Sequence, residues 1–301
     1  MTKKTQHIRI VSPSGVIDPA YINGATSRLR AWGYIVSVGA YAYDVYGRFA
    51  GRDEDRLADL IAANNDPDVD IILCARGGYG LQRIIDRMPV LKKPVIGFSD
   101  ITALHQLATL SGQVSVHGIM CKHIASLSEE SEPIMALRHV LEGEGTEYRI
   151  DPHALNRAGE VTAPVIGGNL SVLYGLQATP YGIRNVISRI QTESGVKPIL
   201  MIEDIGERHY HIDRMMRNLA MSGVLADLSG LIVGQFSDCE DDPSMSCTVY
   251  ETIIEVVADY DYPVLFNAPF GHVEHNLPLW LGRETTLDVR VGSSCRLLQR
   301  G

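Results

Sequence analysis

The chain has 301 residues, a length that suggests about two domains, because a single hydrophobic core rarely grows past ~250 residues. Hydrophobic residues make up 45% of the chain and charged residues 21%, which excludes extensive disorder, and no apolar run reaches the ~18 residues that cross a bilayer. The net charge of -9, without a long run of Lys or Arg, argues against a nucleic-acid partner.

Two further features bear on the cellular compartment and on metal binding. Residues 1–7 are polar and lead directly into an apolar run, so they lack the apolar stretch of a secretion signal and predict a cytoplasmic protein. The five cysteines form no CxxC pair, and their odd number argues against a disulfide framework and against a zinc ribbon.

The first half of the chain alternates short apolar runs with amphipathic segments. The apolar runs predict strands over residues 8–11, 34–38, 69–75 and 94–98. The amphipathic segments predict helices over residues 19–32, 53–64, 81–88 and 101–110. Strands that alternate with helices indicate an α/β domain, a mostly parallel sheet flanked by helices on both faces.

The second half has more strand signal than the first. Residues 142–159 are rich in Gly, Pro and charge, so we place a boundary there between domains at 1–150 and 160–301. Beyond it, apolar runs predict strands over 161–166, 198–202, 231–234, 264–267 and 285–291, the last closing the chain. Helices are predicted over 170–177 and 248–260.

The first segment that could carry chemistry joins a strand to a helix without a loop. It reads Gly97-Phe98-Ser99-Asp100, with Ser99 at the junction. A sharp strand-to-helix turn exposes a side chain at the sheet edge and aims the first helical N–H groups at its target, and nucleophilic serines are often held this way. The alternative is a simple N-cap, a role that Ser and Asp favour.

A second segment, Arg76-Gly77-Gly78-Tyr79-Gly80, follows the apolar run at 69–75. Its glycines permit positive φ angles and close approach of a ligand, so it could cradle an anion or a developing oxyanion. The alternative is a tight turn between a strand and a helix. The sequence after it is not that of a Walker A loop.

Two charged segments of the second half supply candidate acids and bases. Glu203 lies where a parallel strand is predicted to end, followed by His209 and His211, and a solvated charged loop or a catalytic acid both fit this run. His272 follows Phe-Gly in a loop beyond another strand and could act as a general base. A metal site built on Glu203, His209, His211 and His272 is a further alternative.

Together these segments resemble the LD-carboxypeptidase family of serine peptidases, the cytoplasmic muramoyl-tetrapeptide carboxypeptidases, almost from end to end. The matching motifs lie at residues 12–15, 76–80, 97–100, 167–171, 202–204, 212–215 and 270–272. The resemblance implies an N-terminal parallel α/β domain and a smaller β-rich α+β C-terminal domain, with the site in the cleft between them.

The resemblance also implies a Ser-His-Glu triad in which Ser99 is the nucleophile, His272 the general base and Glu203 the acid. The backbone N–H groups of Gly78 and Asp100 would hold the oxyanion. The family removes the terminal D-Ala from a murein tetrapeptide, at the bond to the L centre of diaminopimelate, in peptidoglycan recycling. The family reaction needs no cofactor or metal, and the resemblance also suggests a homodimer.

Two questions remain open at this stage. A sister branch of the same fold inactivates aminoacyl-nucleotide antibiotics, as microcin-immunity proteins do, and is the alternative function. A carboxypeptidase must also bind a free terminal carboxylate. Arg76, Arg208 and the backbone amides of residues 77–80 are the candidates for that contact.

Overall fold

The first half of the chain forms a six-stranded sheet in the computed structural model, which describes residues 5–301. Residues 1–4 of the polar N-terminal segment lie outside the described part. The strand order is β11-β5-β4-β3-β1-β2, and all neighbours are parallel except β11. These strands are β1 (His7–Val11), β2 (Ile35–Val38), β3 (Ile71–Cys74), β4 (Val95–Gly97), β5 (Ser115–His117) and β11 (Leu279–Leu281).

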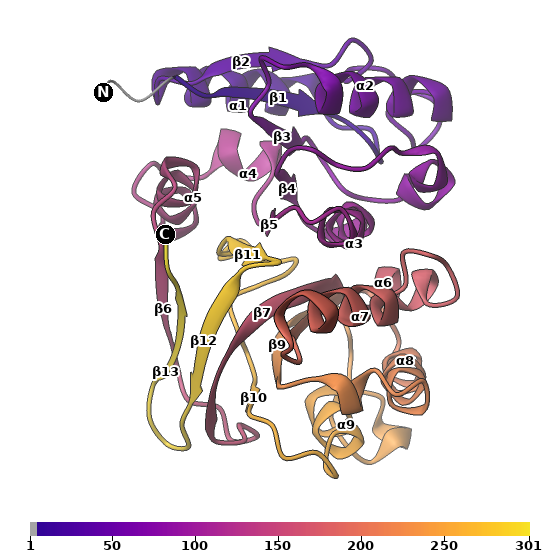
Figure 1. Ribbon diagram of the computed structural model, residues 1–301, viewed down its shortest axis with the longest axis vertical. Coiled ribbons are helices and arrows are strands. Elements are labelled where there is room, and N and C mark those ends of the chain that lie inside the picture. Colours follow the sequence, from indigo (N-terminus) through magenta and orange to yellow (C-terminus); the bar gives the residue numbers. More distant parts are fainter. Residues whose placement is uncertain (1–4) are drawn as a thin grey trace.

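Helices cover both faces of this sheet (Figure 1) because its strands are apolar on both sides. The helices are α1 (Pro19–Ala31), α2 (Asp53–Asn65), α3 (Thr102–Leu110), α4 (Cys121–Ser126) and α5 (Glu132–Glu142). Helices α1, α4 and α5 share one core cluster with residues such as Ile8 and Ile10 of β1. Helices α2 and α3 pack with Ile72 and Cys74 of β3 in another cluster. The predicted parallel α/β architecture is confirmed.

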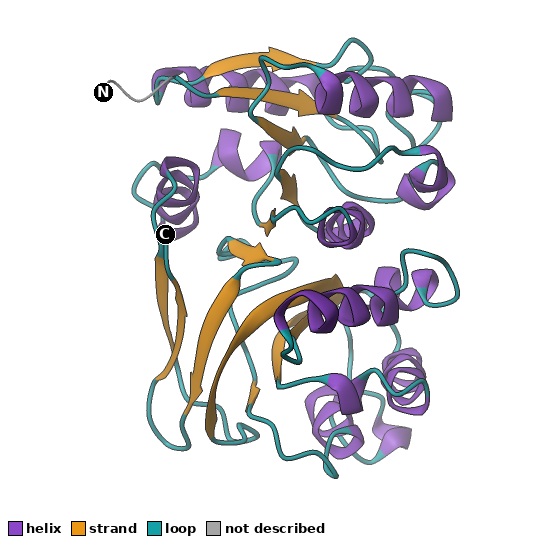
Figure 2. Ribbon diagram, viewed as in Figure 1, coloured by secondary structure: helices purple, strands orange, loops and turns teal. Residues whose placement is uncertain are grey.

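The second half forms a mixed seven-stranded sheet with the order β10-β9-β8-β7-β12-β13-β6 (Figure 2). Strands β7 to β10 are parallel, whereas β12, β13 and β6 are antiparallel. The strands are β6 (Thr146–Ile150), β7 (Gly159–Asn169), β8 (Ile199–Ile205), β9 (Gly230–Ser237), β10 (Val264–Leu265), β12 (Glu284–Val289) and β13 (Cys295–Gln299). The helices are α6 (Leu170–Leu176), α7 (Ile183–Ser194), α8 (His209–Met221) and α9 (Val249–Val256).

Three expectations about individual elements are wrong. Residues 81–88 form two short 3-10 turns, Leu81–Arg83 and Ile85–Arg87, because Ile84 leaves helical geometry at φ -131° and Pro89 favours extended backbone at Met88. The charged run after Glu203 is not only a loop, since α8 begins at His209. Strand β12 does not close the chain, because β13 follows it and pairs with both β12 and β6.

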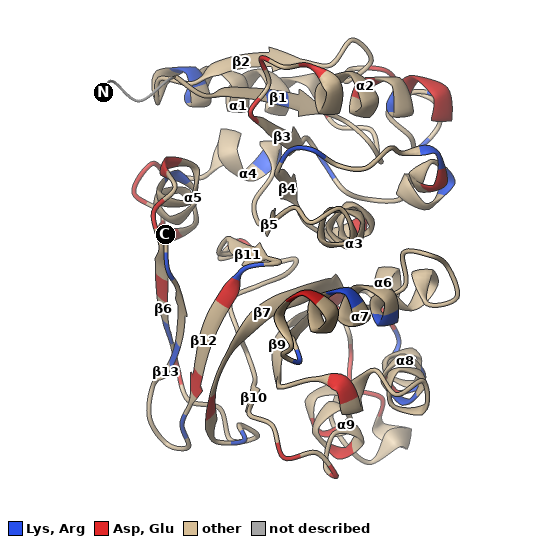
Figure 3. Ribbon diagram, viewed as in Figure 1, with Lys and Arg blue, Asp and Glu red and all other residues tan. Residues whose placement is uncertain are grey.

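The two sheets exchange short segments. Strand β6 precedes residue 151 but belongs to the second sheet, and β11 comes from the C-terminal part of the chain but joins the first sheet. The division at residues 142–159 therefore stays a prediction about folding units. Lys and Arg positions are interspersed with Asp and Glu positions over both halves (Figure 3). Within residues 5–301, every helix is too short or too polar to cross a membrane.

Candidate active site

Ser99 occupies a strained backbone position at the end of β4. The strand ends at Gly97, a 3-10 turn runs over Ser99–Ile101, and α3 follows directly. Ser99 has φ +67°, a left-handed conformation that a non-glycine residue rarely adopts. Such strain is typical of a nucleophile held on a sharp strand-to-helix turn. A plain N-cap serine has extended backbone instead, so this geometry disfavours the N-cap alternative.

The glycine turn after β3 packs directly against this serine. A Cβ atom added to Gly77 would lie 2.7 Å from Cβ of Ser99, so only glycine fits there without displacement. Gly78 has φ +105°, and its N–H has no hydrogen-bond acceptor among residues 5–301. An unpaired N–H beside a candidate nucleophile is what an oxyanion contact requires.

The side chain of Asp100, next to Ser99, points into the protein. The carboxylate is 2% exposed and accepts hydrogen bonds from Ser14 Oγ at 2.7 Å and from the N–H of Leu81 at 2.9 Å. It thereby ties the turn after β1 and the end of the glycine turn to the start of α3. Burial raises the pKa of Asp100, although these donors act in the opposite direction.

Glu203 and His272 meet at the facing edge of the second sheet. Glu203 lies in β8 and is fully buried, and its Oε2 atom is 2.8 Å from Nδ1 of His272. Gly271, at φ +130°, allows this approach, because a Cβ atom there would lie 3.0 Å from Oε2 of Glu203. The carboxylate thus fixes the imidazole so that Nε2 of His272 is free to face a substrate or a nucleophile.

The protonation state of Glu203 follows from its neighbours. Burial by itself raises the pKa of a carboxyl, but the nearby imidazole of His117, together with the hydrogen bond and charge of His272, outweighs it and lowers the pKa of Glu203 to about 2. Glu203 is therefore an anion at neutral pH. A buried anion next to Nδ1 favours a proton on that nitrogen and stabilises the imidazolium when His272 takes up a second proton.

One pocket brings the candidates from both halves together. It has a volume of about 610 Å³, and its walls include Ser99, His272, Gly77 and Gly78. Ser99 and the glycines come from the first sheet, and His272 comes from the loop after β10 in the second. The pocket is a cleft between the two halves, where the carboxyl ends of β3 and β4 face the second sheet.

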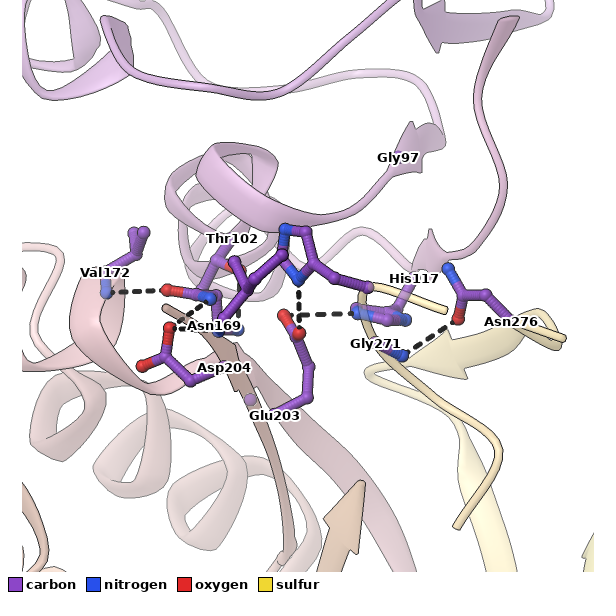
Figure 4. Close-up of polar contacts among 12 residues, drawn as sticks. Gly97, Thr102, His117, Asn169, Val172, Glu203, Asp204, Gly271 and Asn276 are labelled. Atoms are coloured by element: carbon purple, nitrogen blue, oxygen red, sulfur yellow. Dashed lines mark hydrogen bonds and ion pairs between the residues drawn. The ribbon is translucent and has the colours of Figure 1, made fainter. Parts of the chain in front are cut away.

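The motif at residues 167–171 holds the two halves together beneath this pocket. A Cβ atom on Gly168 would lie 2.4 Å from Thr102 Oγ1 of α3, and the N–H of Asn169 donates to that oxygen at 2.9 Å (Figure 4). The Asn169 side chain caps α6 and donates to Asp204 at 2.8 Å. Burial, followed by repulsion from Glu203, raises the pKa of Asp204 to about 7.

Several candidate residues lie elsewhere. Arg208 is the residue before α8, and it lines a different pocket from the one that contains Ser99. Nε2 of His209 is 2.7 Å from Thr252 Oγ1, and Nδ1 of His211 is 3.0 Å from Glu207. The alternative metal set is therefore not assembled, and within residues 5–301 the structure groups no three His, Cys, Asp or Glu side chains as ligands.

The structure also reveals residues that the sequence did not single out. Asp18, Lys122 and His123 line the pocket with Arg76, and no ion pair within residues 5–301 involves Asp18 or Lys122. His117 of β5 approaches the second oxygen of Glu203. Lys122 lies in the first turn of α4, and His117 lies in a strand of three residues. Neither position belongs to a periodic sequence pattern, so neither could be predicted as part of the pocket or its surroundings.

Two family models match most of the chain. Residues 8–118 match the LD-carboxypeptidase N-terminal domain, and residues 162–287 match the LD-carboxypeptidase C-terminal domain. A putative carboxypeptidase of Synechocystis is 33% identical, covering 95% of this chain and 92% of the relative. A probable murein peptide carboxypeptidase of Bacillus subtilis is 30% identical, covering 95% of this chain and 90% of the relative.

Solved structures agree on the fold. The muramoyltetrapeptide carboxypeptidase of Oxalobacter formigenes is 25% identical with a TM-score of 0.84, and the match covers 98% of this chain and 99% of that one. The microcin C7 self immunity protein MccF is 18% identical with a TM-score of 0.80, covering 99% of this chain and 97% of that one. At that lower identity the likeness to MccF shows the fold alone.

Proposed function

Because the chain belongs to the LD-carboxypeptidase family of serine peptidases, we propose that it removes the terminal D-Ala from a muramoyl tetrapeptide, at the bond that follows an L centre. The observation that carries this proposal is the pocket that Ser99, His272 and the glycine turn share, with Glu203 hydrogen-bonded to His272 behind it. A nucleophile, an oriented base and unpaired N–H donors are the parts that acyl transfer needs.

The proposed reaction has two halves. Ser99 Oγ attacks the peptide carbonyl carbon while Nε2 of His272 takes the hydroxyl proton, and the N–H groups of Gly78 and Asp100 hold the oxyanion. The C–N bond then breaks, and His272 returns the proton to the amine of D-Ala. Water, deprotonated by His272, cleaves the acyl ester and regenerates Ser99. Glu203 stabilises the imidazolium in both halves.

Recognition of the free carboxylate is assigned to the positive side of the pocket. Arg76 and Lys122 line it, and a terminal nitrogen of the Arg76 guanidinium also donates to the backbone oxygen of Val16. A terminal carboxylate placed there would satisfy charges that the described chain leaves unpaired. Relatives with murein peptides in their names point to the same substrate class.

The test is mass spectrometry of a peptide panel after incubation with the protein. The panel contains the muramoyl tetrapeptide, the corresponding tripeptide, the pentapeptide and the tetrapeptide with a C-terminal amide. We expect loss of one D-Ala from the tetrapeptide and strong discrimination against the amide, because amidation removes the charge that the site binds. Equal kcat/KM for acid and amide would contradict carboxypeptidase action and indicate an endopeptidase or amidase.

The alternative is hydrolysis of an aminoacyl-nucleotide antibiotic on the same fold. MccF is the structural neighbour that suggests it, and the likeness extends to the fold only. An aminoacyl phosphoramidate nucleotide added to the panel separates the two functions. Cleavage of that compound in preference to the tetrapeptide would favour the alternative.

The cellular setting forms part of the proposal. We propose that the enzyme acts on wall peptides returned to the cytoplasm, in peptidoglycan recycling, and that it works as a homodimer. A deletion strain should accumulate the tetrapeptide, and a cell fraction assay should find the activity with cytoplasmic proteins. Sedimentation of the purified chain at several concentrations measures the oligomeric state.

A further inference from the structure

A second histidine approaches the acid of the proposed triad from the opposite half of the molecule. Nε2 of His117, in β5 of the first sheet, lies 3.8 Å from Oε1 of Glu203, in β8 of the second (Figure 4). His272 occupies the other carboxylate oxygen at 2.8 Å. The Glu203 carboxylate therefore stands between two imidazoles, one from each half.

The approach to Glu203 is the polar contact that the surroundings of His117 offer. The side chain is fully buried, and neither ring nitrogen has a hydrogen-bond partner within residues 5–301. Oε1 of Glu203 is likewise buried and unpaired. An unpaired buried donor and an unpaired buried carboxylate oxygen are each costly, and a shift of about 1 Å would bring these two within hydrogen-bond range.

The rings near His117 carry no negative charge. His105 of α3 is 6.3 Å away, centroid to centroid, and bonds Ser115 Oγ and the Gly97 oxygen. Burial, followed by repulsion from His117, lowers the pKa of His105 to about 3, so His105 is neutral. The Phe98 ring packs against the rings of His117, His123 and His272. Glu203 is thus the anionic group that faces His117.

We infer that His117 is a positioning residue, which donates a hydrogen bond from Nε2 to Oε1 of Glu203 and so holds the carboxylate in line with His272. The inference rests on the proposed triad. It also gives the contact between the two halves a role, because the half that carries Ser99 then supplies a donor to the acid in the other half. His117 is not among the residues that line the pocket of Ser99.

The position of the donor distinguishes this role from simple core filling. In His117→Gln the amide nitrogen falls near the place of Nε2, whereas in His117→Asn it falls near that of Nδ1. His117→Leu removes every donor. If His117 only fills the core, the Gln and Asn variants should have similar activity. If it donates a hydrogen bond to Oε1 of Glu203, only the Gln variant should resemble the wild type.

The first readout is turnover of the tetrapeptide. We expect His117→Leu and His117→Asn to lower kcat roughly 10- to 100-fold, the range for one lost bond to a charged group, with KM nearly unchanged. His117→Gln should recover most of kcat. His105→Gln is the matched control, because it replaces another buried histidine that does not contact Glu203.

The second readout is the titration of His272, followed by NMR of histidine-labelled protein in the absence of substrate. Without the His117 donor Glu203 becomes a stronger proton acceptor, so the apparent pKa of His272 should rise in the Leu and Asn variants and stay near the wild-type value in Gln and in the His105 control. A folded Leu or Asn variant with an unshifted His272 titration overturns the inference.

The two readouts keep this inference separate from the proposed substrate. If the wild type cleaves no tetrapeptide but His272 shifts as described, the substrate proposal fails and the role of His117 stands. If the wild type cleaves the tetrapeptide and the His272 titration does not shift in the Leu and Asn variants, the substrate proposal stands and the role of His117 fails. Should the Leu variant not fold, the comparison of Gln with Asn decides the matter.

Discussion

The Oε2 atom of Glu203 lies 2.8 Å from Nδ1 of His272, although the two residues are 69 positions apart and Glu203 is completely buried. This contact orients the imidazole toward the pocket that contains Ser99. In the proposed triad, the second half of the fold supplies the acid and the base, and the first half supplies the nucleophile. The proposed activity therefore depends on how the two halves pack, as well as on each side chain.

Removal of the Ser99 hydroxyl is the most direct test of the nucleophile. Ser99→Ala should lower kcat by ~10⁴ or more, as deletion of a triad member usually does, and leave the protein folded. Ser99→Gly should be equally inactive, but at least as stable as Ser99→Ala, since glycine tolerates φ +67°. Steady-state kinetics and thermal unfolding check both statements. Near-wild-type turnover in either variant would remove Ser99 from the mechanism.

Gly77→Ala tests the packing of the glycine turn on the nucleophile. The new methyl group would lie 2.7 Å from Cβ of Ser99, so one of the two must move by several tenths of an ångström. A displacement approaching 1 Å at a reacting group can reduce kcat by ~10²-fold. Gly33→Ala is the control, because Gly33 has positive φ but no atom within 4 Å of an added Cβ. We expect Gly33→Ala to lose stability and keep kcat, in contrast to Gly77→Ala.

The low pKa of Glu203 predicts how the free energy of unfolding changes at acidic pH. Its folded-state pKa of about 2 lies below the ordinary 4.5, so its contribution to the free energy of unfolding is complete above pH 4.5 and is lost as the pH falls toward 2. Glu203→Gln lacks this dependence. The difference in unfolding free energy, wild type minus variant, should therefore decrease between pH 4.5 and 2 in denaturant titrations. A constant difference would mean that Glu203 is not held as an anion.

Much of the fold could be predicted from the chain because parallel strands buried on both faces leave continuous apolar runs. The run at 69–75 gave β3, and Ser99 was placed at a strand-to-helix junction, where the structure puts it. Strands β5, β6, β11 and β13 were not found this way. Strands β5 and β11 have three residues each, too short for a period, and β11 is identified by pairing with a segment over 160 residues earlier. Strand β6 lies within the segment at 142–159 in which the sequence predicts a domain boundary.

Some residues of the candidate site could be predicted from sequence motifs, whereas others could not. The family resemblance predicts that Glu203 and His272 meet, and their side chains do so at 2.8 Å. Local sequence patterns alone do not predict this contact, because it depends on close approach at Gly271. His117 and Lys122 join the site only through tertiary packing between the halves. Arg208 lies within a motif-rich segment but does not line the pocket of Ser99, because β8 ends at Ile205 and the chain continues into α8.

Arg76 and Lys122 provide the last prediction, which concerns the substrate carboxylate. Both line the pocket of Ser99, and each charge should add to the preference for a free acid over an amide. Arg76→Met and Lys122→Met keep the length of the side chains but remove their charge. We expect KM for the tetrapeptide to rise about tenfold or more in at least one variant, with kcat/KM for the amide unchanged, so that the ratio of acid to amide falls.

The control for this experiment is Arg208→Met, since Arg208 lies outside the pocket. Its ratio of acid to amide should equal that of the wild type. If Arg76→Met and Lys122→Met both keep the wild-type ratio while the wild type still rejects the amide, the carboxylate is read by backbone N–H groups of residues 77–80 instead of by a cation. That result would leave carboxypeptidase action in place and move its specificity to the glycine turn, where Gly78 already has an N–H without an acceptor among residues 5–301.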